Sequence, residues 1–567
     1  MKKVLSVLLM LALLGAMLVP FAVAEDQEPI TLTYFYGAPG DQPTADNKIY
    51  KKIEEEFGIK FEFEFLAGDL DETLGLKLQD MEDLPDLFDG GNSAETLIDA
   101  GALINLLDYV NPEDTPNIWA HIEPQKNRII THDEDLDEDV MYIIPNYGLG
   151  EGEQIVNEVN GPAFFIQKQV LAWAGYPTIK TLDEYFDLIE RFIAENPTNP
   201  DGVPYIGFDI LCDGWRHFCL INPVQHLMGR PNDGEVLVDV TKEDYPTETF
   251  INQPYAKPYY KKLNEEFKKG IISPDTFVMS YDQYIAQLST GTVLGMFDQT
   301  WDFADATNAL KTDKKFENTY VALGLVYDEE DVKDVLPEGW KIEEHYVNGS
   351  LPNLDRGAGI SVSCKYPERI IAMWEKMLSP EWALLMNWGI EGEDYSVVDG
   401  RLTMTAEQFA NTTDNEWRKA NRAHAIWDSS PKRQGYIMEG EFAGQCWEPG
   451  NQPENVFGLM NDYDKDFLSH YGYQKFGDFV NPPIELAPYG EAWQINTDPI
   501  LKENTDFLNI QDKDLPGIIM AADDAEFDAK WDAFVAEIEP SATAKSEFMH
   551  EEILKLVAAY NGASEAE

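Results

Sequence analysis

Cysteine and histidine are scarce in this chain of 567 residues. Four cysteines are too few and too scattered for a zinc cluster or a disulfide-built scaffold: Cys212, Cys219, Cys364 and Cys446. Cys212 and Cys219 are close enough in sequence for a disulfide in an exported protein, and buried free thiols are the equal alternative. The eight histidines show no metal-ligand spacing. A metal-built or disulfide-built fold is therefore excluded.

The known catalytic motifs are also missing. The chain has no Gly-x-Ser-x-Gly elbow, no phosphate-binding loop ending in Gly-Lys-Ser/Thr and no His-Glu-x-x-His pair. The acidic runs at 132–139 and 461–466 lack the central glycine and terminal glutamate of a calcium loop. The sequence thus predicts no enzyme and no cofactor.

Basic residues are outnumbered by acidic ones. The chain has 103 Asp and Glu against 42 Lys and Arg, which gives a net charge of −61. A field of this sign repels nucleic acid and polyanions. Nucleic-acid binding is excluded, and a neutral ligand fits better than an acidic one. The length and the 44% hydrophobic content allow more than one core.

Residues 1–24 have the order of a signal peptide. Lys2 and Lys3 precede an apolar run, and Ala22-Val23-Ala24 forms a small-residue cleavage pattern. A retained membrane anchor is the alternative, for which the run is short. No cysteine follows the cleavage site, so the usual lipoprotein attachment is not expected. The sequence predicts an exported protein that is extracellular, associated with the cell surface or periplasmic.

Strand and helix patterns alternate along the rest of the chain. Residues 30–36 and 59–65 predict strands on either side of a helix near 49–57, which Gly58 ends. Residues 164–174 suggest a further helix. The strand-helix-strand order at the start predicts an α/β lobe with a largely parallel sheet.

Four passages, in the same order along the chain as in a known family, resemble that family. They are FFIQKQVLAWAGYPTIKTLDEYFDLIERF (164–192), FKKGIISPDTF (267–277), STGTVLGMFDQTWD (289–302) and the segment from KYPERII to GIEGEDYSVVDG (365–400). They are similar to extracellular solute-binding proteins of bacterial ABC importers, in the long-chain branch of oligosaccharide and alginate-oligosaccharide receptors. NPTNPDGVPY (196–205) does not match the alginate-type calcium loop, so no cofactor is expected, and calcium stays open as a ligand without its usual loop.

The resemblance implies a periplasmic-binding-protein-like fold. Two α/β lobes joined by hinge crossings would enclose a ligand cleft. The expected lobes are 25–145 with 327–365, and 146–326 with 366–567. Such a monomer would capture an oligosaccharide by lobe closure and deliver it to the permease subunits of an ABC transporter. A receptor for a peptide or other small solute is the first alternative, and an exported carbohydrate-active enzyme is the second.

Candidate ligand-binding residues stand where strands are expected to end, because ligands of parallel sheets bind there. Trp301 is the first candidate, since it follows the apolar run VLGMF at the place where the family has a stacking aromatic. The other junctions and the turn after residue 388 supply Trp215, Tyr147, Tyr36, Gln299, Asp298, Asn146, Asp89, Arg356, Asp355, Glu391 and Tyr395.

Each candidate also has a structural explanation. Trp301 could belong to the core, because large aromatics are mostly buried. Arg356 could form a plain salt bridge in so acidic a protein. The glycines beside Glu391 and Tyr395 could serve only to end a helix and turn the chain.

Overall fold

The computed structural model describes residues 28–565 except 92, 134–135, 150–152, 350, 355 and 413. The expected signal peptide and the candidate Asp355 lie outside this part. Within it, no helix has the length and apolar character needed to cross a membrane.

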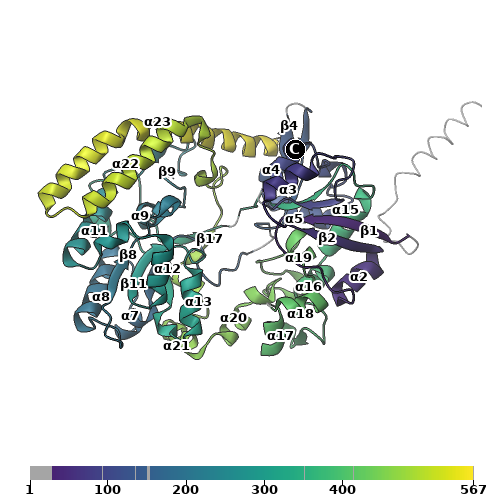
Figure 1. The fold of residues 1–567 in the computed structure, drawn as a ribbon, viewed down its shortest axis with the longest axis horizontal. Helices are drawn as coiled ribbons and strands as arrows, with labels where there is room; N and C mark the ends of the chain where they lie inside the picture. Colours follow the sequence, from purple (N-terminus) through teal and green to yellow (C-terminus); the bar gives the residue numbers. More distant parts are fainter. Residues whose placement is uncertain are drawn as a thin grey trace, which may run out of the picture. The chain divides into compact units, whose positions relative to one another are not determined.

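The chain forms two compact units (Figure 1). The first consists of the described residues of Met1–Ile155, Ser350–Asn455 and Ala563–Glu567, and the second of Val156–Gly349 and Val456–Gly562. The division differs from the expected lobes at three places, because residues 146–155 and 366–455 belong to the first unit and residues 327–349 to the second. Helix α15 (Pro367–Met377) belongs to the first unit because Ile370, Ile371 and Trp374 are fully buried in its core.

The first unit is built on a five-stranded sheet with the order β2-β1-β3-β14-β6. These strands are β2 (Ile59–Phe65), β1 (Ile30–Tyr36), β3 (Leu87–Asp89), β14 (Gly357–Ile360) and β6 (Ile144–Pro145). Strand β1 pairs in parallel with β2 and β3, whereas β14 is antiparallel to both of its neighbours. The predicted strands and the intervening helix are confirmed, but the sheet is mixed and not largely parallel, because two of its four strand pairings are antiparallel.

Helices cover both faces of this sheet. Helices α2 (Lys48–Phe57) and α15 share one core with β1, and α3 (Leu70–Lys77) and α4 (Ala94–Asp99) share another with β1 and β3. Gly58 ends α2 with a φ of 61°, a left-handed value that glycine adopts without strain.

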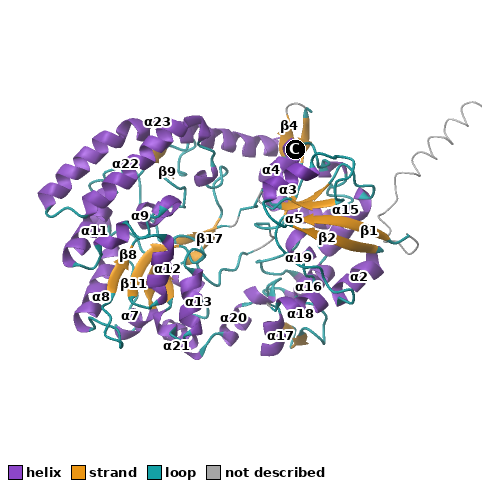
Figure 2. Ribbon diagram, in the orientation of Figure 1, coloured by secondary structure: helices purple, strands orange, loops and turns teal. Residues whose placement is uncertain are grey.

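The second unit contains a four-stranded mixed sheet with the order β12-β7-β11-β8. The strands are β12 (Tyr320–Leu323), β7 (Ala163–Gln167), β11 (Val293–Asp298) and β8 (Ile206–Asp209). Helix α8 (Leu182–Glu195) packs on one face, and α12 (Tyr281–Ser289) and α13 (Ala304–Thr312) pack on the other. Figure 2 shows these strands in orange among purple helices.

The predicted helix at 164–174 is wrong in its first half. Residues Ala163–Gln167 form strand β7, and only Lys168–Trp173 form helix α7. Strand β7 pairs with β11 on one side and β12 on the other, and all five of its residues are buried. An apolar run of this kind fits either structure, and pairing on both edges decides for the strand.

Two long helices from the end of the chain complete the second unit. Helix α22 (Leu501–Ile519) packs against α11 (Lys257–Lys269), and both contribute to the largest core. Helix α23 (Asp524–Glu565) covers a hairpin of β9 (Val236–Val238) and β10 (Thr247–Thr249).

Candidate functional site

Two tryptophans stand side by side on the second unit. Trp215 lies in the short helix η3 (Gly214–His217), and Trp301 follows strand β11. Their ring centroids are 5.8 Å apart and the rings are 14° from parallel. Their exposed fractions are 56% and 50%. Because burial of an indole is favourable, a pair left exposed in this way is a candidate binding surface.

An ion pair fixes the loops that carry these indoles. Arg216 Nε donates hydrogen bonds to both carboxylate oxygens of Asp302, at 2.9 and 3.2 Å. The guanidinium also lies 4.4 Å from the ring centre of Trp215 and 3.8 Å from that of Tyr281. The arginine therefore ties the Trp215 turn to the residue that follows Trp301. Held rings lose little conformational entropy when a ligand stacks on them.

Gln299 and Asp298 support Trp301. The indole Nε1 donates to Gln299 Oε1 at 2.9 Å. Asp298 is fully buried and accepts hydrogen bonds from the Gln299 amide and the Tyr284 hydroxyl, each at 2.7 Å. Desolvation, with a smaller contribution from the nearby charge of Asp302, raises the pKa of Asp298 to about 7. With no exposed surface, Asp298 holds the loop in place.

Cys219 lies beside these carboxylates. Its sulfur is 3.6 Å from Asp298 Oδ1, and no disulfide joins it to Cys212. Cys219, Asp298 and Asp302 place potential metal ligands within 4.8 Å of one another, the one such group in the described part of the chain. However, Asp302 already pairs with Arg216, and burial raises the pKa of the Cys219 thiol well above its usual value. A metal requires the thiolate, so this donor set fits a metal poorly.

Four predicted residues meet at one edge of the sheet in the first unit. Tyr36 ends β1, Asp89 ends β3, Asn146 follows β6 and Arg356 precedes β14. Arg356 Nη2 donates to the Tyr36 hydroxyl at 3.2 Å, and Arg356 Nε lies 3.6 Å from Asp89 Oδ2. Asn146 Nδ2 donates to the same carboxylate oxygen at 3.1 Å. Burial raises the pKa of Asp89 to about 6. This is the strand-end position at which α/β folds bind ligands.

Sequence reasoning missed two members of this cluster, Lys432 and Trp427. Lys432 Nζ lies 4.3 Å from the ring centre of Tyr147 and 3.9 Å from that of Trp427. Arg356 also approaches the Tyr147 ring, at 5.6 Å. Desolvation lowers the pKa of the buried Lys432 to about 8. Trp427 belongs to helix α19 (Ile426–Ser429) and Lys432 follows it, so the search for strand ends could not find them.

Glu391 and Tyr395 join neither group. Tyr395 is 7% exposed and packs against Trp388, with 5.8 Å between ring centroids. Gly389 has a φ of 88°, and the carboxylate of Asp394 accepts a hydrogen bond from the Ile390 amide at 2.7 Å. These contacts account for the turn without a ligand, in agreement with the structural alternative.

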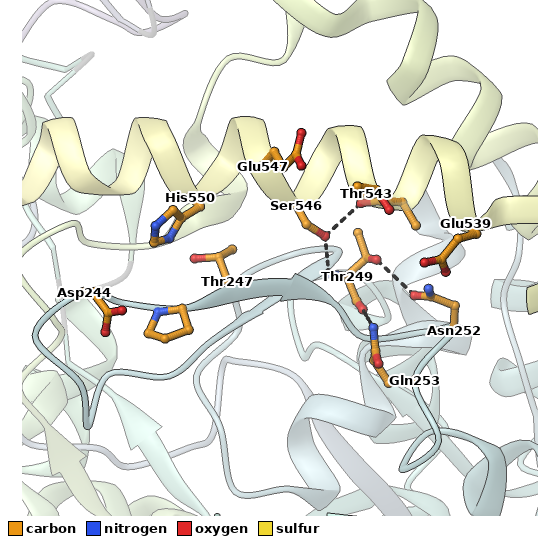
Figure 3. A pocket seen from close by; sticks show the side chains of 12 residues that line it. Asp244, Thr247, Thr249, Asn252, Gln253, Glu539, Thr543, Ser546, Glu547 and His550 are labelled. Atoms are coloured by element: carbon orange, nitrogen blue, oxygen red, sulfur yellow. Dashed lines mark hydrogen bonds between the residues drawn. The ribbon is translucent and has the colours of Figure 1, made fainter. Parts of the chain in front are cut away.

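A separate groove of about 380 Å³ lies between helix α23 and strand β10 (Figure 3). None of the predicted site residues lines it. The Thr249 amide donates to Ser546 Oγ at 2.9 Å, and Thr249 Oγ1 donates to Asn252 Oδ1 at 3.0 Å. These polar groups bond to one another, and the bond from Thr249 to Ser546 joins helix α23 to the hairpin.

Comparison with known proteins identifies one family. Residues 48–349, more than half of the chain, match the model described as bacterial extracellular solute-binding protein. No curated protein matches the chain.

Solved structures show the same fold. An extracellular solute-binding protein from Bifidobacterium longum subsp. infantis is 14% identical, with a TM-score of 0.58 over 95% of this chain and 100% of that one. The S. pneumoniae ABC-transporter substrate binding protein FusA, as an EF-hand mutant in complex with fructo-nystose, is 16% identical, with a TM-score of 0.53 and the same coverage. An HMO-binding, ABC-transporter-associated protein from B. longum infantis is 14% identical, with a TM-score of 0.55 over 94% of this chain and 99% of that one.

Proposed function

The chain belongs to the bacterial extracellular solute-binding protein family, and we propose that it is the exported substrate-binding component of an ABC importer for a neutral oligosaccharide. A solute-binding protein is a binding component and not an enzyme, so the ligand would leave it unchanged. The observation that carries the proposal is the exposed, nearly parallel pair of Trp215 and Trp301.

The chemistry of this pair suits sugars. A pyranose ring presents a face of C–H groups that packs on an indole, and its hydroxyls bond to planar polar side chains. Asn146 and Arg356 offer such polar groups in the first unit, beside the ring of Tyr147. The net charge of −61 disfavours a polyanionic ligand. FusA, whose structure holds fructo-nystose, and the HMO-binding protein share the fold, which supports a glycan as the ligand class.

Transport would require two conformations and a membrane partner. We expect the two units to close on the glycan, because a ligand shifts the population toward the conformation that it binds best. The closed monomer would then deliver the glycan to the permease subunits of the importer. No step in this cycle breaks a covalent bond.

A fluorescence titration tests the proposal. The purified mature protein would be titrated with neutral malto-, xylo-, manno- and fructo-oligosaccharides and with a panel of short peptides, while tryptophan emission is recorded. We expect a saturable change with at least one glycan series, and mass spectrometry should recover the sugar intact.

The variants Trp215→Ala and Trp301→Ala should weaken this binding about tenfold or more. Val278→Ala, which removes an exposed side chain elsewhere in the second unit, is the matched control and should not. Saturable binding of peptides alone would favour the first alternative, and cleaved sugar would favour an enzyme.

A further inference from the structure

A third exposed tryptophan lies on the second unit. All 13 tryptophans lie in the described part of the chain, and among them only Trp215, Trp301 and Trp493 are exposed, whereas the others are buried or half-buried. Trp493 is 53% exposed and sits in the short helix η9 (Ala492–Gln494). An exposed leucine is ordinary on a protein surface, but large aromatic side chains are usually covered. Three exposed indoles on one unit therefore call for a common explanation.

Trp493 is held firmly on the segment that precedes β9. Gly234 has a φ of 72°, and a Cβ atom added there would lie 2.9 Å from Trp493 Cβ. The buried Asp233 accepts hydrogen bonds from the Ala492 amide and the Tyr489 hydroxyl, each at 2.9 Å. The backbone under Trp493 is thus fixed against residues 233 and 234, and its indole stays outside.

The same segment reaches the turn that carries Trp215. Glu235 Oε1 lies 3.3 Å from His217 Nε2, and His217 belongs to η3 together with Trp215. Glu235 also contacts Lys545 Nζ at 3.3 Å. A short series of direct contacts, through Gly234, Glu235 and His217, therefore connects Trp493 to the Trp215 turn. His217 Nδ1 also lies 3.1 Å from the Gly214 carbonyl oxygen, so the polar atoms of Glu235 and His217 are engaged within the protein and serve to fix the turn.

We propose that Trp493 forms a second stacking subsite, and that the glycan is a chain long enough to reach it from the Trp215–Trp301 pair. This inference rests on the proposed function and adds a minimum length to the ligand. It explains why the indole of Trp493 is left exposed where it packs beside residues 233–235, the segment that contacts η3. The contact between Glu235 and His217 would hold the two subsites in place relative to each other.

Calorimetric titration with short and long members of the same neutral oligosaccharide series tests the inference. Trp493→Ala should weaken binding of long members about tenfold and leave the disaccharide unchanged, because the disaccharide occupies only the Trp215–Trp301 pair. Trp301→Ala should weaken both. Trp493→Phe keeps an aromatic face and should restore most of the affinity for long members.

Leu501→Ala removes another exposed apolar side chain of the second unit and should bind as the wild type does. Thermal unfolding of each variant would verify that it is folded. If folded Trp493→Ala binds long members like the wild type, or weakens short and long members equally, the second subsite does not exist, although the proposed function stands. If the wild type binds no member of any series, both proposals fail.

Discussion

Asp298 and Trp301 stand three residues apart and have different roles in the second unit. Trp301 presents an indole to solvent, whereas Asp298 is buried among Tyr284, Cys219 and the Gln299 amide. A buried carboxyl of this kind favours its neutral form, because the protein interior solvates charge poorly. Stability of the second unit should consequently depend on pH through this residue.

The variant Asp298→Asn tests this dependence. The folded pKa of about 7 lies above the usual 3.8, so this group stabilises the fold at low pH and loses that contribution as pH rises toward 7. Asparagine does not titrate. Relative to the wild type, the variant should therefore gain about 2 to 3 kcal/mol of stability between about pH 5 and about pH 8.

Chemical denaturation of both proteins at several pH values measures this gain. Asp201→Asn, at an exposed position, gives the background for an Asp-to-Asn change. Parallel stability curves for the wild type and Asp298→Asn would contradict the interpretation of Asp298 as a buried, largely neutral acid.

Among the elements, strand β11 does most to position the site. It is buried along its length, pairs with β7 and β8, and ends at Asp298 immediately before the loop of Trp301. Gly295 gives helix α8 room to approach. A Cβ atom there would lie 2.0 Å from the Tyr185 hydroxyl oxygen, which donates to the Phe165 carbonyl at 2.7 Å. A side chain at Gly295 must displace this tyrosine.

The substitution Gly295→Ala should lower the thermal midpoint by roughly 5 °C or more, because it overpacks the core and breaks a buried hydrogen bond. Differential scanning calorimetry gives the midpoint. Gly161→Ala is the matched control, since a Cβ atom at Gly161 meets nothing within 4 Å. Equal midpoints for the two variants would show that α8 moves away from the strand at little cost.

The whole molecule combines two units, each with its own core, and a large excess of negative charge. The 42 basic residues can neutralise fewer than half of the 103 acidic ones. Many lysines form exposed ion pairs, such as Lys261 with Asp524 and Lys269 with Glu190. Exposed pairs contribute little to stability, so repulsion among the remaining carboxylates should dominate the surface electrostatics.

Added salt should therefore stabilise the protein. Raising sodium chloride from about 10 mM to about 300 mM shortens the Debye length from about 30 Å to below 10 Å and screens this repulsion. We expect the thermal midpoint to rise by several degrees. Choline chloride at equal ionic strength should have the same effect, because screening depends on charge alone. A falling midpoint would show that the ion pairs outweigh the repulsion.

The sequence by itself determined the class of fold, the family resemblance and several local structures. Strand β1, helix α2 and its glycine stop follow from patterns over a few residues, and such patterns express local backbone and burial preferences. The position of Trp301 after an apolar strand was likewise sufficient to nominate it. Local patterns failed for β7, where neighbours on both edges decide the structure.

Only the tertiary structure decided which side chains meet. Trp215 and Trp301 are 86 positions apart in the chain numbering, and their stacking depends on Arg216 reaching Asp302. Lys432 joins Tyr147 in the same way, from a segment with no strand signal. Burial also gives Asp298 a different role from the exposed Trp301, which lies three residues later in the chain. Contacts between distant segments and solvent exposure are properties of the packed chain, and no local pattern contains them.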